Sequence, residues 1–143
     1  MSPNIAIGVG CRLGCSADAI EALIHRALDR LPELASGRLA GTTSPDPCSP
    51  GLYSIADKQG EPGLAEAACR LGFDLTFLAR ATLREQTSLV RTQSAASRRR
   101  FAVPSVAEAA ALAGAGPGAM LLVARLAEGG ATCAIAVSAE FRA

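Results

Sequence analysis

The N-terminal segment constrains the fold more than any other part of the sequence. An apolar run from Asn4 to Gly10 (NIAIGVG) ends in glycines and predicts a short buried strand. Ser16 stands where a helix N-cap is expected, and hydrophobic residues recur at helical spacing from Ile20 to Leu31 before Pro32 ends the pattern. A strand, a glycine-bearing loop and a helix form the first half of a β-α-β unit, so the sequence predicts an α/β protein.

The middle of the chain continues this alternation of strands and helices. Strand-like segments are expected at Arg38 to Ser44, Leu52 to Ile55 and Phe73 to Leu78. A helix is expected from Pro62, a residue type favoured at the first helical position, to Gly72, which suits a helix end. Half of all residues are hydrophobic, mostly Ala, Leu and Val, and such small side chains suit helices packed closely on a sheet.

Two capping boxes mark helix starts in the C-terminal half. Thr82 with Glu85, and Ser105 with Glu108, have the spacing of a capping box, so a helix is expected to begin at each. The polar segment between them, Gln86 to Arg100, ends in three arginines and is expected to be mobile.

The C-terminal segments complete the predicted fold. Ala119 to Ala124 and Thr132 to Ser138 are strand-like, and the turn at Gly129 and Gly130 predicts an antiparallel hairpin between them. We therefore expect a single three-layer α/β domain over residues 1–143, with a mixed, mostly parallel sheet, helices on both faces and a C-terminal hairpin.

Charge and composition exclude some classes of partner. A formal net charge of +1 gives no overall attraction to phosphate backbones, and four Phe and one Tyr offer little surface for base stacking, so nucleic acid is not an expected partner. No apolar run is long enough to cross a membrane, and no secretory signal is visible. The five cysteines lack the spacing of a disulfide framework, which favours reduced thiols in a cytoplasmic protein.

The segment from Gly8 to Ser16 (GVGCRLGCS) is the most informative for function. A glycine loop leading into a helix can direct backbone N–H groups at a carboxylate or phosphate, and Arg12 could bind a carboxylate through two hydrogen bonds. Gly8, Gly10 and Gly14 give a spacing one residue longer than a dinucleotide fingerprint, so nicotinamide or flavin binding is the weaker alternative and no cofactor is expected. The glycines could also simply form the turn.

The cysteines and the histidine have ordinary interpretations. Cys11 and Cys15 lie four residues apart, without a second pair or a nearby histidine, so no metal is expected, because zinc needs about four ligands. They are predicted to be small packing residues, with a thiolate activated by the helix N-terminus as the alternative. His25 is expected to form a solvated salt bridge with Glu21 or Asp29.

Other charged residues could take part in binding or catalysis. Asp57, Lys58 and Glu61 lie between a predicted strand and a predicted helix, at the edge of an α/β sheet where ligands usually bind. Lys58 could bind an acidic ligand while a carboxylate orients it or acts as a base; alternatively, Glu61 caps the helix and Lys58 is solvated. Glu108 has similar possibilities, although its capping spacing favours a structural role. Arg98 to Arg100 is expected to be a solvated loop, with capture of phosphate or carboxylate as the alternative.

These segments are expected to meet in space. Parallel strands place the loops that follow them at one sheet edge, so residues 8–16, 57–61 and 105–108 should converge on one cleft. The candidate ligand-binding residues are Gly8, Gly10, Cys11, Arg12, Gly14, Cys15, Ser16, Lys58 and Ser105, and the candidate acids or bases are Asp57, Glu61 and Glu108.

Several segments match a known family in the same order over nearly the whole chain. They are IAIGVGCRLGCS (Ile5 to Ser16), DKQGEPGLAEAACRLG (Asp57 to Gly72) with the strand after it, VPSVAEAAAL (Val103 to Leu112), and the C-terminal hairpin. On these segments the chain resembles the CobE family and the C-terminal domain of CbiG. The resemblance implies a role in cobalamin (vitamin B12) biosynthesis, with a precorrin or corrinoid intermediate as ligand and other enzymes of the pathway as partners. Precorrins carry a rim of carboxylates, which Arg12, Lys58 and helix N-termini could bind.

The resemblance implies two alternative activities. CbiG-type proteins take part in opening the δ-lactone of cobalt-precorrin-5A, whereas free-standing CobE-like proteins are associated with the aerobic route. We expect the chain to bind or act on a precorrin or corrinoid intermediate of the aerobic route. A non-catalytic carrier is one hypothesis, and the alternative is hydrolase or isomerase activity on the corrin ring through Asp57, Glu61 or Glu108. The chain departs from the family at Ala107, where many relatives have cysteine, and at Val123 to Leu126, which lacks a common lysine-bearing pattern.

Overall fold

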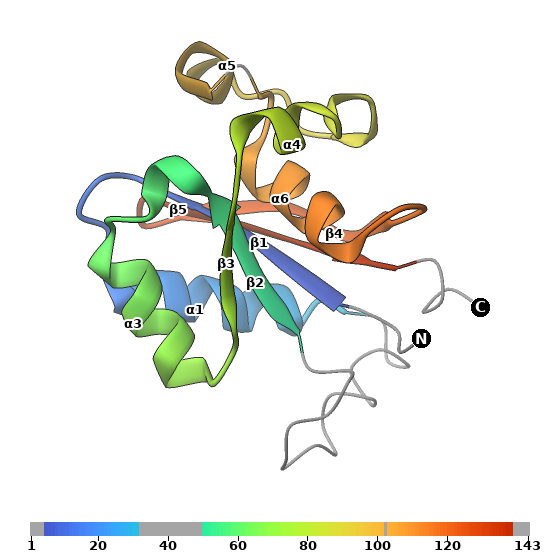
Figure 1. Ribbon diagram of the computed structural model, residues 1–143. Coiled ribbons are helices and arrows are strands. Elements are labelled where there is room, and N and C mark those ends of the chain that lie inside the picture. Colours follow the sequence, from blue (N-terminus) through green and yellow to red (C-terminus); the bar gives the residue numbers. More distant parts are fainter. Residues whose placement is uncertain (1–4, 32–49, 102, 139–143) are drawn as a thin grey trace.

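The computed structural model describes residues 5–31, 50–101 and 103–138, which form one five-stranded sheet with helices on both faces (Figure 1). The strands are β1 (Ile5–Cys11), β2 (Gly51–Ile55), β3 (Leu75–Leu78), β4 (Met120–Glu128) and β5 (Ala131–Val137). The helices are α1 (Ala17–Leu28), α3 (Pro62–Leu71), α4 (Arg80–Arg84), α5 (Ala95–Phe101) and α6 (Val106–Ala115), and the 3₁₀ turns are η1 (Ala56–Lys58) and η2 (Thr87–Leu89). Within the described ranges, no helix has the length and apolar character that crossing a membrane requires.

The sheet has the strand order β3-β2-β1-β5-β4. β1 and β2 pair in parallel, as do β2 and β3. β5 lies antiparallel to both β1 and β4, so the C-terminal hairpin extends the sheet on the far side of β1. The expected α/β fold, with a mixed sheet and a C-terminal hairpin, is confirmed. The sheet has two parallel and two antiparallel strand pairs, so it is less parallel than expected. The reason is that β1 has β2 on one side and the antiparallel strand β5 on the other.

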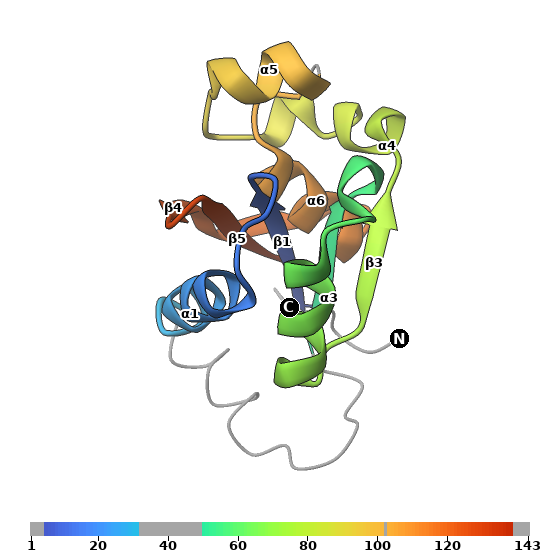
Figure 2. The ribbon, with the colours of Figure 1, turned by 90° about the vertical axis from the view of Figure 1, so that its left-hand side faces the viewer.

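The two faces of β1 enter different cores, because successive residues of a strand point to opposite faces. Ile5, Ile7 and Val9 pack in the core that includes α1 and α3. Ala6 packs in a second core on the opposite face, together with residues of α6 and α4. The domain therefore has three layers: α1 with α3, the sheet, and α6 with α4 (Figures 1 and 2).

Helix α6 lies unusually close to β1 because a glycine occupies the strand at their contact. A Cβ atom built on Gly8 would lie 1.8 Å from the carbonyl oxygen of Ala107 in α6. Most residues of α6 are buried, including those on the side away from the sheet, where α4 and η2 pack. Gly8 therefore belongs to the contact between sheet and helix rather than to a loop.

Several helix ends fall where the sequence predicts them. The Ser16 hydroxyl accepts a backbone N–H from the first turn of α1 and caps that helix. Helix α3 begins at Pro62 and is followed by Gly72, which adopts a φ of +74°. The Ser105 hydroxyl accepts the backbone N–H of Glu108 and caps α6.

Other local expectations differ from the structure. Thr82 and Glu85 do not start a helix, because α4 begins at Arg80 and has no side-chain cap. The arginine run expected in a solvated loop, Arg98 to Arg100, lies on α5 instead. The strand expected at Arg38 to Ser44 lies outside the described residues.

Candidate functional site

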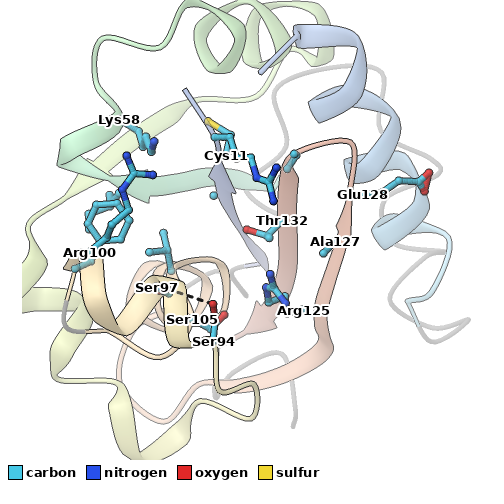
Figure 3. A pocket seen from close by; sticks show the side chains of 17 residues that line it. Cys11, Lys58, Ser94, Ser97, Arg100, Ser105, Arg125, Ala127, Glu128 and Thr132 are labelled. Atoms are coloured by element: carbon cyan, nitrogen blue, oxygen red, sulfur yellow. Dashed lines mark hydrogen bonds between the residues drawn. The ribbon is translucent and has the colours of Figure 1, made fainter. Parts of the chain in front are cut away.

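A pocket of about 390 Å³ lies at the carboxyl ends of β1 and β2 (Figure 3). Gly10, Cys11 and Arg12 line it from the end of β1, Lys58 from η1, and Ser105 from the start of α6. Residues 8–16, 57–61 and 105–108 were expected to converge on one cleft, and each of these segments contributes at least one residue to the pocket. The volume falls toward the lower end of the roughly 300 to 1,000 Å³ of small-molecule sites.

Two further elements complete the pocket. Helix α5 and the segment before it supply Ser94, Ser97 and Arg100, and the C-terminal hairpin supplies Arg125 and Thr132. In Figure 3, side chains from η1 and α5 lie on one side of the pocket and those from β4 and β5 on the other. The site thus joins parts of the chain that are distant in sequence.

The pocket is electropositive. Its basic side chains are Arg12, Lys58, Arg100 and Arg125. None of them forms an ion pair with a carboxylate of the described residues. The acidic residue in the lining is Glu128, which is ion-paired with Arg26 of α1 and points away from the pocket in Figure 3.

Lys58 is the most buried of these basic residues. It is the only lysine of the sequence, and it is 7% exposed. Glu61 lies nearby in the sequence, but its carboxylate accepts the backbone N–H of Gly14 at 3.0 Å. A buried ammonium group without a carboxylate partner costs free energy, and that cost falls when an anion enters the site.

Three backbone N–H groups of the loop after β1 donate to acceptors within the protein. The N–H of Arg12 donates to the carbonyl oxygen of Gly130 at 2.8 Å, and the N–H of Cys15 donates to the carbonyl oxygen of Arg12 at 3.1 Å. The N–H of Gly14 donates to the carboxylate of Glu61. These three groups are therefore not available to a ligand, contrary to the expected backbone anion site. The loop instead offers the exposed side chain of Arg12 to the pocket.

Four candidate ligand residues lie outside the pocket lining and have structural roles. Gly8 packs against α6, and Gly14 adopts a φ of +76°, which favours glycine. The Cys15 thiol donates to the carbonyl oxygen of Gly129 at 3.5 Å, and Ser16 caps α1. At Gly8 and Gly14, packing and turn geometry therefore explain the glycine pattern.

The thiols of Cys11 and Cys15 lie in environments that do not activate them, and the histidine forms an exposed ion pair. Burial raises the pKa of the Cys11 thiol to about 11, although nearby Lys58 opposes the shift. Burial also raises the pKa of Cys15, so an activated thiolate is not supported at either position. His25 lies 3.7 Å from Glu21 with more than half of its side chain exposed, as expected for a solvated salt bridge.

Asp57 was a candidate for contact with a ligand, but its carboxylate is bound to Arg80 instead. Its carboxylate accepts hydrogen bonds from the guanidinium of Arg80 at 2.5 to 3.2 Å, and these bonds lower the pKa of Asp57. The same guanidinium lies 5.4 Å from the ring centroid of Phe101 at the end of α5. Asp57 does not line the pocket, and its ion pair links η1 to α4 and α5.

Glu61 does not cap α3, which was one interpretation of its position. It precedes the helix, but its side chain makes no capping hydrogen bond there. The carboxylate, on a residue only 6% exposed, instead fastens the loop after β1 through Gly14. Its observed role is therefore to hold the loop that carries Arg12.

Glu108, in the first turn of α6, is fully buried and its carboxylate accepts four hydrogen bonds. One carboxylate oxygen accepts the N–H groups of Arg91 and Thr92, each at 2.8 Å. The other accepts the Thr92 hydroxyl at 2.8 Å and the N–H of Arg125 at 2.9 Å. Burial alone would raise the pKa of Glu108, but the hydrogen bonds outweigh it and the pKa is lowered. Only the Ser105 half of the expected capping box forms, and Glu108 does not line the pocket.

Several pocket residues were not expected from the sequence. Ser94, Ser97 and Thr132 carry no local pattern that distinguishes them from surface hydroxyls. Arg125 did carry a signal, because it is a basic residue inside an otherwise apolar strand-like run (MLLVARLA, residues 120–127). It lies in the segment that departs from the family's lysine-bearing pattern, yet it supplies a positive charge to the pocket.

The fold and the site together define a class: a mixed-sheet α/β domain with an electropositive pocket where its parallel strands end. Comparison with known protein families identifies the family to which the chain belongs. The family described as "Cobalamin synthesis G C-terminus" matches residues 5–136. The chain therefore belongs to this cobalamin-biosynthesis family, which includes the CobE and CbiG C-terminal proteins that the sequence resembles.

Solved structures agree with this assignment. CobE, a protein from the cobalamin (vitamin B12) biosynthetic pathway, is 36% identical, with a TM-score of 0.79 over 96% of this chain and 92% of CobE. The cobalamin biosynthesis protein ChiG from Agrobacterium tumefaciens str. C58 is 34% identical, with a TM-score of 0.59 over 94% and 98% of the two chains. A cobalamin biosynthesis protein G homologue from Sulfolobus solfataricus shares the fold, at 17% identity and a TM-score of 0.58 over 96% of this chain and 37% of its own. No curated protein matches significantly.

Proposed function

We propose that this protein binds a corrin-ring intermediate of cobalamin biosynthesis and holds carboxylates of the ring's rim in the electropositive pocket. Lys58 carries the proposal: it lines the pocket, is 7% exposed and has no carboxylate partner within the described part of the chain. Membership of the cobalamin-biosynthesis family supports a tetrapyrrole as the ligand. The resemblance to CobE-like proteins further supports assigning the step to the aerobic route.

The proposed contacts are charge-assisted hydrogen bonds. Asp57 attracts Lys58 electrostatically, but no carboxylate of the described residues forms an ion pair with it, so a rim carboxylate would provide that direct partner. A hydrogen bond to a charged group in a sheltered site contributes about 1.5 to 3 kcal/mol. One such contact therefore corresponds to roughly ten- to a hundredfold in affinity.

The pocket size determines which part of the ligand enters. At about 390 Å³, the pocket suits one edge of a tetrapyrrole with its carboxylate side chains rather than the whole macrocycle. The rest of the ring would then lie outside the pocket. This arrangement suits a protein that binds and hands on an intermediate.

Binding fits the geometry better than hydrolysis or isomerisation of the ring. Asp57, Glu61 and Glu108, the carboxylates expected to act as acid or base, all accept hydrogen bonds from the protein. None of the three lines the pocket. An acid or base must reach the reacting atoms of its substrate, and these side chains are held elsewhere.

A titration with hydrogenobyrinic acid tests the proposal. The tetrapyrrole's visible spectrum should shift on mixing, and protein and pigment should co-elute on gel filtration at micromolar concentration. Lys58→Met should weaken binding by about tenfold or more, because the charge-assisted contact is lost. Arg30→Met, an exposed cation just after α1 on the opposite side of the sheet, is the matched control and should bind like the parent.

Two outcomes would contradict the proposal. The first is the absence of both a spectral shift and co-elution for the parent protein. The second is unchanged affinity of Lys58→Met, which would remove Lys58 from the binding site. Conversion of the pigment to a product of different mass would instead support the hydrolase alternative.

A further inference from the structure

The carboxylate of Glu108 connects two walls of the pocket without lining it. Glu108 lies in the first turn of α6, next to the pocket residue Ser105, and is fully buried. One of its oxygens accepts the backbone N–H groups of Arg91 and Thr92, which precede the pocket residues of α5. The other accepts the backbone N–H of Arg125, which belongs to β4. A single side chain therefore fixes backbone in two elements that supply pocket residues.

The bond to Arg125 falls at an irregularity in the sheet. On the edge strand β4, Val123 pairs with Ile135 and Leu126 pairs with Cys133, so β4 has one more residue than β5 between these pairs. Arg125 lies within this bulge, and its N–H donates to Glu108 at 2.9 Å. β-Bulges change the direction of a side chain and occur often beside functional sites. The direction of the Arg125 side chain therefore depends on the carboxylate that holds its backbone.

Arg125 is also one of the basic residues that face the ligand in the proposed function. Its side chain lines the pocket, on the opposite side from Lys58 in Figure 3. It is half-buried, and no carboxylate of the described residues pairs with it. A guanidinium held in this way can bind a carboxylate through two parallel hydrogen bonds.

We infer that Glu108 is a positioning residue for ligand binding: by accepting the N–H of Arg125 in the β4 bulge, it holds the Arg125 guanidinium where it binds a carboxylate of the ligand. The inference rests on the proposed function, since it concerns how that pocket binds its ligand. It replaces the acid or base role that the sequence suggested for Glu108.

The glutamine variant breaks this link selectively. In Glu108→Gln, the amide oxygen can still accept the N–H groups of Arg91 and Thr92. The amide NH₂ then faces the N–H of Arg125, and two donors cannot form a hydrogen bond. The variant should therefore release the β4 bulge while keeping the segment before α5 attached.

The first measurement needs no ligand. Hydrogen exchange of the Arg125 amide, followed by NMR, should be faster in Glu108→Gln than in the parent, because that N–H loses its acceptor. Glu66→Gln, the same chemical change in an exposed ion pair of α3, should leave the Arg125 amide unchanged. Unchanged exchange in Glu108→Gln would overturn the inference whether or not the protein binds a tetrapyrrole.

The second measurement is a double-mutant cycle on hydrogenobyrinic acid binding. Arg125→Ala should weaken binding by about tenfold or more, and Glu108→Gln by a large part of that factor. Because Glu108 acts through Arg125, adding Glu108→Gln to Arg125→Ala should change the affinity by less than about twofold. Added to Lys58→Met, Glu108→Gln should keep its full effect.

The outcomes separate the inference from the proposed function. A parent protein that does not bind contradicts the proposed function. If the parent binds and Glu108→Gln lowers the affinity as much in the Arg125→Ala background as it does alone, the positioning role is overturned. The proposed function is then still supported. Should Glu108→Gln not fold, Glu108→Asp keeps the charge but shortens the reach, and it enters the same cycle with the same expected result.

Discussion

The ammonium group of Lys58 lies in a pocket that contains three arginines and whose acidic lining residue, Glu128, is paired with Arg26. A buried charge without a partner destabilises the folded protein, and natural binding sites keep such residues because the ligand supplies the partner. At Lys58, therefore, binding and stability should respond in opposite directions to the same substitution.

Replacing Lys58 by methionine should stabilise the protein in the absence of ligand. Methionine has a similar length and carries no charge, so the expected gain is about 0.5 to 2 kcal/mol. Thermal denaturation at neutral pH and low salt should show a Tm higher by roughly 2 to 6 °C. A lower Tm would mean that Lys58 has a stabilising partner in the free protein.

Arg12 should affect binding modestly and stability hardly at all. Its side chain is exposed, whereas its backbone N–H and carbonyl groups hold the loop, and alanine keeps both. An exposed charge pair contributes about 0 to 1 kcal/mol, so Arg12→Ala should weaken tetrapyrrole binding by up to about fivefold. Calorimetric titration and a melting curve test this, and a large fall in Tm would show that the side chain braces the loop.

At the scale of elements, the contact between β1 and α6 sets the position of the pocket. Gly10 of β1 and Ser105 at the start of α6 both line the pocket, so the separation of strand and helix fixes the distance across it. Gly8 permits this separation, since any Cβ there would overlap the carbonyl group of Ala107.

Gly8→Ala should therefore be severely destabilising, by about 3 kcal/mol or more, because backbone rather than a mobile side chain must move. Gly60→Ala is the matched control: a Cβ at that position meets nothing within 4 Å. It should change the free energy of unfolding by no more than about 1 kcal/mol, in the stabilising direction. Urea denaturation compares the two, and a Gly8→Ala variant as stable as the parent would contradict the close packing of α6.

The link from α6 to β4 should show in acid stability. The pKa of Glu108 is lowered from its ordinary value of 4.5, so its contribution is fully present above that pH and is lost as pH falls through the lower folded-state pKa. Glu108→Gln should be less stable than the parent at pH 7, and the difference should narrow below pH 4.5. Melting temperatures between pH 7 and pH 3 test this, and a difference that stays constant would mean that Glu108 is not ionised in the folded state.

At the scale of the whole molecule, the sequence predicted elements better than it predicted the partners of side chains. The glycine pattern of β1 and the caps at Ser16 and Ser105 are local signals, and local signals gave the strand, α1 and α6 correctly. The convergence of residues 8–16, 57–61 and 105–108 followed from the rule that parallel strands end at one edge. That rule places backbone but does not say where a side chain points.

The errors arose where a distant residue supplied the partner. Glu61 resembles a helix cap, but Gly14, far away in sequence, offers a free N–H. In the sequence Asp57 resembles a binding-site residue, but in the structure it forms an ion pair with Arg80 of α4. Arg125 enters the pocket because of a bulge in β4, and strand periodicity in the sequence cannot show such a bulge.

Modification of Lys58 tests the central claim most directly. Because Lys58 is the only lysine, an amine-reactive reagent followed by mass spectrometry of peptides reports on this pocket, with the terminal amine as an internal control. At hydrogenobyrinic acid concentrations about ten times the Kd, the rate of Lys58 modification should fall roughly tenfold while the terminal amine reacts at its original rate. If the ligand is bound, as judged by its spectrum, and Lys58 still reacts at the rate of the free protein, the carboxylate rim does not occupy this pocket.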